Sequence, residues 1–243
     1  MPALVEADDL GHYVVKLRGA GQGPKALTAE LVAGELGRAL GLRVPDIALV
    51  EVEHALAASE PDPELCLPLE ASVGTNLGLD FLPGSITFDP IVGPVPDAQT
   101  ASRIVLFDAF VANVDRTPRN ANLLSWHRDV WLIDHGAALY FHHGWTPATV
   151  LDESRDPFRE VKDHVLLLHA TALEQAATHL SGVLTEALID GIVQQIPDDW
   201  LTDDQSFEGA AAQRRAYRAW LVDRLSALPA LVEEAERARA LRV

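Results

Sequence analysis

Residues 113–136 constrain this chain more than any other segment, because they place an acidic residue directly after a run of four apolar residues. That residue is Asp134, and the run before it reads Val-Trp-Leu-Ile. A buried carboxylate without a partner is costly, so it needs a cation or hydrogen-bond donors. A second acid, Asp115, lies upstream, with Asn120 and Asn122 between the two. The pattern suggests a site for magnesium and a nucleotide.

The same segment predicts a β-hairpin with strands at 123–126 and 130–133. Such a hairpin would bring Asp134 back beside Asn120. One Asn and one Asp suit Mg²⁺, which takes one or two protein oxygens and completes its shell with phosphate and water. Asp115, outside that shell, is placed to orient a substrate hydroxyl and accept its proton. Acid-plus-Asn loops also form Asx turns and helix caps, so a site and a scaffold explain these residues equally well.

Charge and composition exclude several classes of partner. The chain has 243 residues, 48% of them hydrophobic, and a net charge of −17. It is long enough for a sizeable core, and its negative field repels nucleic acid and anionic membranes, so neither is expected as a partner. Cys66 is the single cysteine, which excludes an internal disulfide. The N-terminus does not resemble a leader peptide, and no apolar stretch reaches the roughly 18 residues of a membrane span. We expect a cytoplasmic protein.

Three glycines alternate with other residues at 19–25, directly after a predicted hairpin. The hairpin joins strands at 3–6 and 12–17 through an acidic turn, and Lys16 lies near the end of its second strand. Such glycines allow a loop to approach a ligand with its backbone N–H groups. A flexible connector is the more frequent explanation of this spacing, and no Gly-Lys-Ser/Thr closes it as in a Walker loop.

The rest of the chain predicts a mixture of helices and strands. Residues 26–40 form an apolar helical stripe with Thr28 as a plausible N-cap and Gly41 as a stop signal. Residues 53–73 predict a loop or a partly helical connection, and 84–96 are rich in Gly and Pro. Further strands are expected at 47–52 and 76–83, a buried helix at 98–111, and more helices at 161–180, 183–196 and within 207–242. The arginines and glutamates of the last segment suggest a solvated face.

Four motifs, in order, resemble those of known kinases. The sequence DRTPRN at 115–120, followed by DHG at 134–136, resembles the catalytic and metal-binding segments of the protein-kinase-like superfamily. The similarity is to HipA-like kinases above all, with some to phosphoinositide kinases. Val-Val-Lys at 14–16 resembles a nucleotide-binding strand, and 30–45 resembles the HipA-type helix that begins with Glu and ends near Gly-Leu-x-Val-Pro. Together these motifs are far more specific than any one alone.

The resemblance implies an α+β, two-lobed kinase-like fold. A small β-rich N-lobe with one helix would span 1–84, and a mostly helical C-lobe with the catalytic loop and metal-binding hairpin would span 85–243. The implied function is transfer of a phosphoryl group from ATP, with Mg²⁺, to a hydroxyl of a protein Ser/Thr or of a small molecule. The alternative is a pseudokinase-like nucleotide-binding regulator, such as half of a toxin–antitoxin-like pair, with a partner protein.

The resemblance also assigns roles to individual residues. Lys16 would hold the α- and β-phosphates and pair with Glu30, and Asp115 would be the catalytic acid/base. The metal ligands would be Asn120 and Asp134, with Asn122 as a second candidate because it lies two residues further on. Adenine would meet the backbone of a hinge within 78–82, at Asp80, Phe81 and Leu82. An apolar floor beneath the ring would be formed by Leu124 and Ile133.

Two departures from the kinase pattern stand out. Related kinases have a phosphate-covering loop before the strand that precedes the Lys strand, whereas few residues precede that strand here. Either that loop is absent, or the true start lies upstream of Met1, or residues 19–25 cover the phosphates from the other side of Lys16. In the last case Gly21 and Gly23 would contact them. Thr117 also stands where related enzymes have His, so we expect the proton to be positioned differently.

The nine histidines do not predict a zinc site, because their spacing matches neither a helical nor a knuckle pattern. His135 differs from the others only because it follows Asp134 directly. We expect it to orient that carboxylate or a phosphate.

Overall fold

A four-stranded antiparallel sheet forms the N-terminal part of the protein, in the order β1-β2-β4-β3. The computed structural model describes residues 2–21, 23–59, 62–91, 93, 95–202 and 204–242. The strands are β1 (Pro2–Glu6), β2 (His12–Lys16), β3 (Ile47–Val52) and β4 (Gly74–Asp80). The predicted hairpin is confirmed: Leu10 takes a left-handed conformation in its turn, and the Asp9 carboxylate accepts the Gly11 N–H at 2.8 Å.

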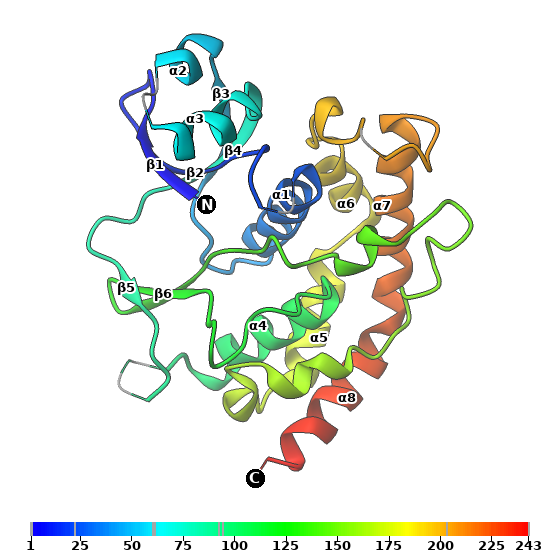
Figure 1. Cartoon of the computed structure of the whole chain (residues 1–243). Helices are drawn as coiled ribbons and strands as arrows, with labels where there is room; N and C mark the ends of the chain where they lie inside the picture. Colours follow the sequence, from blue (N-terminus) through cyan, green and yellow to red (C-terminus); the bar gives the residue numbers. More distant parts are fainter. Residues whose placement is uncertain are drawn as a thin grey trace.

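Helix α1 (Pro24–Ala39) lies between this sheet and the helices of the C-terminal part (Figure 1). At Gly34 the helix approaches the sheet so closely that an added Cβ would lie 2.5 Å from the Ile47 side chain. The predicted Thr28 N-cap is wrong, since the helix begins four residues earlier with Gly23 as its N-cap. Thr28 is instead fully buried. Two short helices, α2 (His54–Ser59) and α3 (Pro63–Glu70), occupy the segment predicted as loop or partly helical.

The second sheet has the order β5-β6-β7 and contains the predicted hairpin. Its strands are β5 (Ile86–Thr87), β6 (Leu123–Trp126) and β7 (Asp129–Leu132). His127 and Arg128 take left-handed conformations at the hairpin turn. Helix α4 (Ala98–Phe110) precedes the hairpin and is almost wholly buried, as its apolar composition predicts.

Helices form most of the remainder (Figure 1). The continuous helix predicted over 161–180 is wrong: its first half is irregular with two 3-10 turns, and the α-helix begins only at Leu173. The elements after the hairpin are η1 (Tyr140–His143), η2 (Arg159–Asp163), η3 (Leu167–His169), α5 (Leu173–Val183), α6 (Glu186–Val193), η4 (Asp198–Trp200), α7 (Ala210–Arg224), η5 (Leu225–Ala227) and α8 (Leu228–Ala240).

Arg224 corrects the expectation of a solvated C-terminal face. Its side chain is 1% exposed, and it donates hydrogen bonds to the carbonyls of Ala109, Phe110 and Ser154. Burial lowers the pKa of this guanidinium to about 10. The charge therefore joins the C-terminal end of α7 to the end of α4, because the carbonyls at a helix C-terminus attract cations.

A small antiparallel sheet region followed by a mostly helical remainder confirms the predicted α+β, two-lobed fold. One hydrophobic core runs from α1 through α4 to α8. The lobe boundary near residue 84 stays a prediction. In the described part of the chain, every helix is too short or too polar to span a bilayer.

Candidate active site

Lys16 and Glu30 form the first ion pair of the site. Lys16 Nζ lies 2.5 Å from Glu30 Oε2 and 2.6 Å from Asp134 Oδ1. Strand β2 carries the lysine, helix α1 the glutamate, and the end of the β6–β7 hairpin the aspartate. Three residues separated by up to 118 positions in the chain therefore meet at one ammonium group.

Burial and charge act in opposite directions on this pair. Burial lowers the pKa of Lys16, but the carboxylates of Glu30 and Asp134 outweigh it and raise the pKa above its ordinary value. Burial likewise raises the pKa of Glu30, but Lys16 and His135 outweigh it and hold that pKa far below its ordinary value. Both groups are therefore charged at neutral pH.

His135 contacts Glu30, whereas the sequence suggested that it orients Asp134. Its Nδ1 lies 3.4 Å from Glu30 Oε1, and its ring is fully buried against the edge of Phe107. Asp134 itself takes a left-handed conformation, with a φ of 56°. The chain therefore turns between these two residues, so that one side chain enters the core and the other stays half exposed beside Lys16.

The two asparagines meet Asp115 in the loop between α4 and β6. Asn120 Nδ2 donates to Asp115 Oδ2 at 2.7 Å, and Asn122 Nδ2 donates to the same oxygen at 3.3 Å. Thr117 and Asn120 close a tight turn through reciprocal backbone hydrogen bonds. Asn122 has a φ of 49°, so this segment is not the extended strand on which the two asparagines would share a face. They converge because the backbone turns.

A buried cluster of polar side chains holds this loop from below. Arg116 Nε donates to Asp108 Oδ2 at 2.5 Å, and both side chains are fully buried. Asp108 also accepts from Asn113 at 2.9 Å and lies 2.9 Å from His164 Nε2. The guanidinium reaches the carbonyl of Asn122 as well. Arg116 thus ties the loop that carries Asp115 to helix α4 and to the start of the β6–β7 hairpin.

A cavity of about 250 Å³ brings together some of the predicted site residues, whereas its lining does not include Glu30, Asn120, Asn122, Leu124 or Ile133. Lys16, Asp115 and Asp134 line it, with Gly21 and Gly23 from the loop between β2 and α1. The remaining lining residues are Pro2, Leu17, Ala20, Ala26, Leu27, Gly136 and Ala137. Gly21 and Gly23 thus face the same cavity as Lys16 and Asp134, and their contact with phosphates stays a prediction.

The glycine loop and the start of α1 line one side of this cavity. Gly21 and Gly23 have backbone φ values of 62° and 69°, which residues other than glycine rarely adopt. The N-terminus of α1 has no side-chain cap, and its first-turn residues Ala26 and Leu27 line the cavity. Pro24 at the start of α1 has no N–H, and the Ala26 N–H donates to the Gly23 carbonyl at 3.1 Å, so it is mainly the helix dipole that favours an anion here.

The predicted hinge residues lie apart from this cavity. Asp80 N–H donates to the Asp46 carbonyl at 2.8 Å. Phe81 N–H donates to the His12 carbonyl at 2.9 Å, and the Leu82 side chain is buried. The N–H groups of the first two residues are therefore already bonded within the N-terminal sheet region.

The predicted adenine floor forms one half-buried face of the hairpin. Leu124 pairs with Trp131 across the strands, and Ile133 lies on the same face two residues later. Leu4 and Val14 pair across β1 and β2 and share a sheet face with Lys16. Leu4 is 57% exposed, which leaves apolar surface on that face. Leu4 and Val14 were not predicted as neighbours of the adenine position. The available signal was their period-two spacing from Lys16.

Asp108 and Arg116 were likewise not identified as supports of the site. The signal was present, because Asp108 is one of the few polar residues in the centre of an otherwise apolar helix. A charge in such a position requires a buried partner. The partner's identity could not be read from the sequence.

A family model described as HipA-like kinase matches residues 1–222. No curated protein matches the chain. Among solved structures, the crystal structure of a Helicobacter pylori proinflammatory kinase, CtkA, is similar over 100% of this chain and 95% of that chain, with a TM-score of 0.56 and 13% sequence identity. At that identity the likeness shows the fold. The family model spans the sheet, the candidate site and most of the helical part, so this chain belongs to the HipA-like kinase family.

Proposed function

We propose that this protein is an ATP- and Mg²⁺-dependent kinase that transfers a phosphoryl group to a hydroxyl. One observation carries the proposal: a single cavity is lined by a lysine, a glycine loop, an uncapped helix N-terminus and two aspartates from separate elements. Family membership supports phosphoryl transfer at the level of the class.

The charges of the cavity favour a nucleotide with its metal over a bare anion. Lys16 and the dipole of α1 attract phosphate, whereas Asp115 and Asp134 repel it. A bound divalent cation would offset this repulsion. Asp134, Asn120 and Asn122 supply the hard oxygen ligands that Mg²⁺ prefers, which fits this metal. When bound, the metal would neutralise charge on the phosphates.

The chain's own residues would then perform the remaining tasks. Lys16, held by Glu30, would orient the α- and β-phosphates. Asp115, fixed by the two asparagine amides, would hold a substrate hydroxyl in line and accept its proton. The adenine ring would lie between Leu4 and Val14 above and Leu124 and Ile133 below. The hydroxyl would belong to a protein or a small molecule.

Thermal unfolding with and without nucleotide tests the proposal. We expect MgATP to raise Tm, by an amount that grows with nucleotide concentration, because a ligand that binds only the folded state stabilises it. ATP with EDTA should have a much smaller effect. Identical unfolding curves with and without millimolar MgATP would refute a nucleotide site. Binding without any phosphate transfer would favour the pseudokinase-like alternative.

A further inference from the structure

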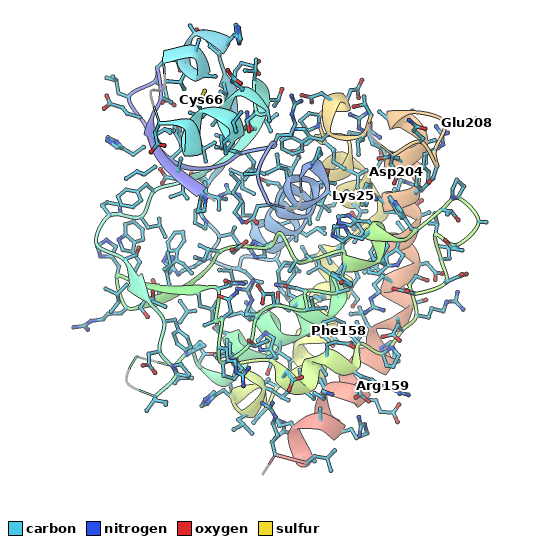
Figure 2. All side chains as sticks on the ribbon, in the orientation of Figure 1. Lys25, Cys66, Phe158, Arg159, Asp204 and Glu208 are labelled. Atoms are coloured by element: carbon cyan, nitrogen blue, oxygen red, sulfur yellow. The ribbon has the colours of Figure 1, made fainter. Side chains whose placement is uncertain are left out.

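The glycine loop, residues 19–24, is anchored at both ends by the segment that joins α6 to α7. Arg18, just before the loop, has its Nη1 2.8 Å from Asp199 Oδ2. Lys25, just after the loop, has its Nζ 3.0 Å from Asp204 Oδ2. Figure 2 shows Lys25 and Asp204 next to each other. Two aspartates distant in sequence thus contact the two residues that flank the loop.

The anchor at Lys25 includes two further hydrogen bonds. Asp204 Oδ1 accepts the backbone N–H of Ser206 at 3.1 Å, which orients the carboxylate toward the lysine. Lys25 also donates to the carbonyl of His142 at 2.6 Å. His142 lies in η1, which follows Asp134 along the chain. The lysine therefore joins the loop to the segment that leaves the metal-binding hairpin.

The anchor at Arg18 reaches into the N-terminal sheet. Its Nη2 donates to the Val73 carbonyl at 2.7 Å, and its backbone N–H donates to Asn76 Oδ1 at 2.7 Å. In the same C-terminal segment, Trp200 Nε1 donates to the Thr75 carbonyl at 2.9 Å. The segment thus bonds both to the residue before the loop and to the strand beside it.

The loop packs closely at Gly19, where the N–H donates to Ser72 Oγ at 2.9 Å and an added Cβ would lie 2.4 Å from Ala71, but not at the two glycines that follow. An added Cβ at Gly21 or at Gly23 would meet no atom within 4 Å. Both glycines nevertheless line the cavity that contains Lys16 and Asp134. The positions of Gly21 and Gly23 over this cavity therefore depend on the contacts at either side of them, which are those of Arg18 and Gly19 before and of Lys25 after.

We propose that Asp204 and Asp199, through Lys25 and Arg18, are positioning residues that hold the glycine loop over the nucleotide phosphates. The inference rests on the proposed function, because it assigns the loop to the phosphates of that nucleotide. The covering loop is thus held from the C-terminal part of the chain, by a segment remote in sequence from every kinase-like motif.

The variants Lys25→Met, Asp204→Asn and their double mutant test the stronger anchor. If the loop occupies its binding position only about one-tenth of the time without the pair, the apparent Kd rises about tenfold. We expect that rise for the magnesium complex of the non-hydrolysable analogue AMP-PNP in each single variant. The double mutant should bind the analogue as tightly as either single variant, because both changes remove the same contact. KM for ATP should rise by a similar factor, with kcat changed much less.

Backbone hydrogen exchange of residues 18–26 supplies a second readout. We expect faster exchange in both single variants without nucleotide. Asp223→Asn is the matched control, because its carboxylate lies 2.9 Å from Arg155 and is similarly shielded, at 22% exposure against 12% for Asp204. This control should alter neither nucleotide affinity nor exchange in the loop.

Two results separate this inference from the proposed function. If the wild type binds no Mg·AMP-PNP, the proposed function fails and the inference fails with it. If the wild type binds but the Lys25 and Asp204 variants bind equally well, only the inference is overturned. Faster loop exchange with unchanged affinity would also overturn it, because the anchor would then not serve the phosphates. An equal loss in Asp223→Asn would show a general effect of charge and would overturn it too.

Discussion

Arg116 and Asp108 form a fully buried ion pair, with 2.5 Å between Nε and Oδ2, directly beneath the catalytic loop. Burial raises the pKa of Asp108, but Arg116 and His164 outweigh it and hold that pKa well below its ordinary value. The carboxylate is therefore charged inside the core. It fixes the residue after Asp115, and through the arginine it fixes the backbone of Asn122.

Arg116→Met should destabilise the protein by about 3–5 kcal/mol, because it leaves Asp108 as a buried charge without its main partner. Urea unfolding followed by circular dichroism measures this change. Arg155→Met is the control: its pair with Asp223 is exposed on the arginine side, so its loss should destabilise the protein far less. Equal losses in the two variants would contradict the structural role of the buried pair.

Lys16→Met should remove most of the stabilisation by MgATP, because it takes the positive charge out of the cavity. For a wild type at about a hundredfold excess of nucleotide over Kd, that stabilisation is about 2.7 kcal/mol. Glu30→Gln should give a smaller loss, since Glu30 acts by orienting the lysine. Each variant is compared with its own Tm without nucleotide. Lys162→Met, at an exposed lysine of η2, should behave as the wild type.

Asp115→Asn should separate chemistry from binding. We expect phosphoryl transfer to fall about 10²- to 10⁴-fold, the usual contribution of a general base, with nucleotide affinity little changed. Asp134→Asn should lose both activity and the magnesium-dependent part of binding. Measurement of ADP release and of the Kd for Mg·AMP-PNP distinguishes the two. Normal turnover in Asp115→Asn would exclude the assigned role.

Asn122→Ala should raise the magnesium concentration needed for half-maximal nucleotide binding more than Asn120→Ala does. The carbonyl of Asn122 accepts the N–H of Ile133 at 3.1 Å, which places Asn122 across the hairpin from the residue before Asp134. Asn120 instead closes the turn with Thr117. A magnesium titration at fixed nucleotide compares the variants, and a larger effect at Asn120 would reverse the assignment.

Stability should decline as the pH falls below 6.5, in part because of His142. Burial lowers the pKa of His142 well below this ordinary value, with smaller contributions from His143 and Lys25. The folded state keeps the ring neutral, so below pH 6.5 the unfolded state binds more protons and stability falls. His142→Gln should flatten the dependence of unfolding free energy on pH in this range. His127→Gln, at an exposed turn residue, should leave the slope unchanged.

The strand and the hairpin of the site could be predicted from the sequence, because the patterns that indicate them lie within a few residues. The β-forming residues of 12–17 predicted the strand that carries Lys16, and the turn residues after Trp126 predicted the hairpin that ends at Asp134. Each depends on propensity and periodicity within a few residues. The start of α1 was misplaced because Thr28 has the chemistry of an N-cap but lies buried inside the helix.

The sequence by itself determined the α+β class, the hairpin with its two acids and asparagines, and, through the order of four motifs, the kinase-like family. Only the tertiary structure decided that His135 supports Glu30, that Arg224 lies in the core, and that Asp204 reaches Lys25. The physical reason is the distance along the chain over which each effect acts. Periodicity and turn chemistry act between near neighbours, whereas the partner of a buried charge is chosen by how distant elements pack, and no local pattern records that choice.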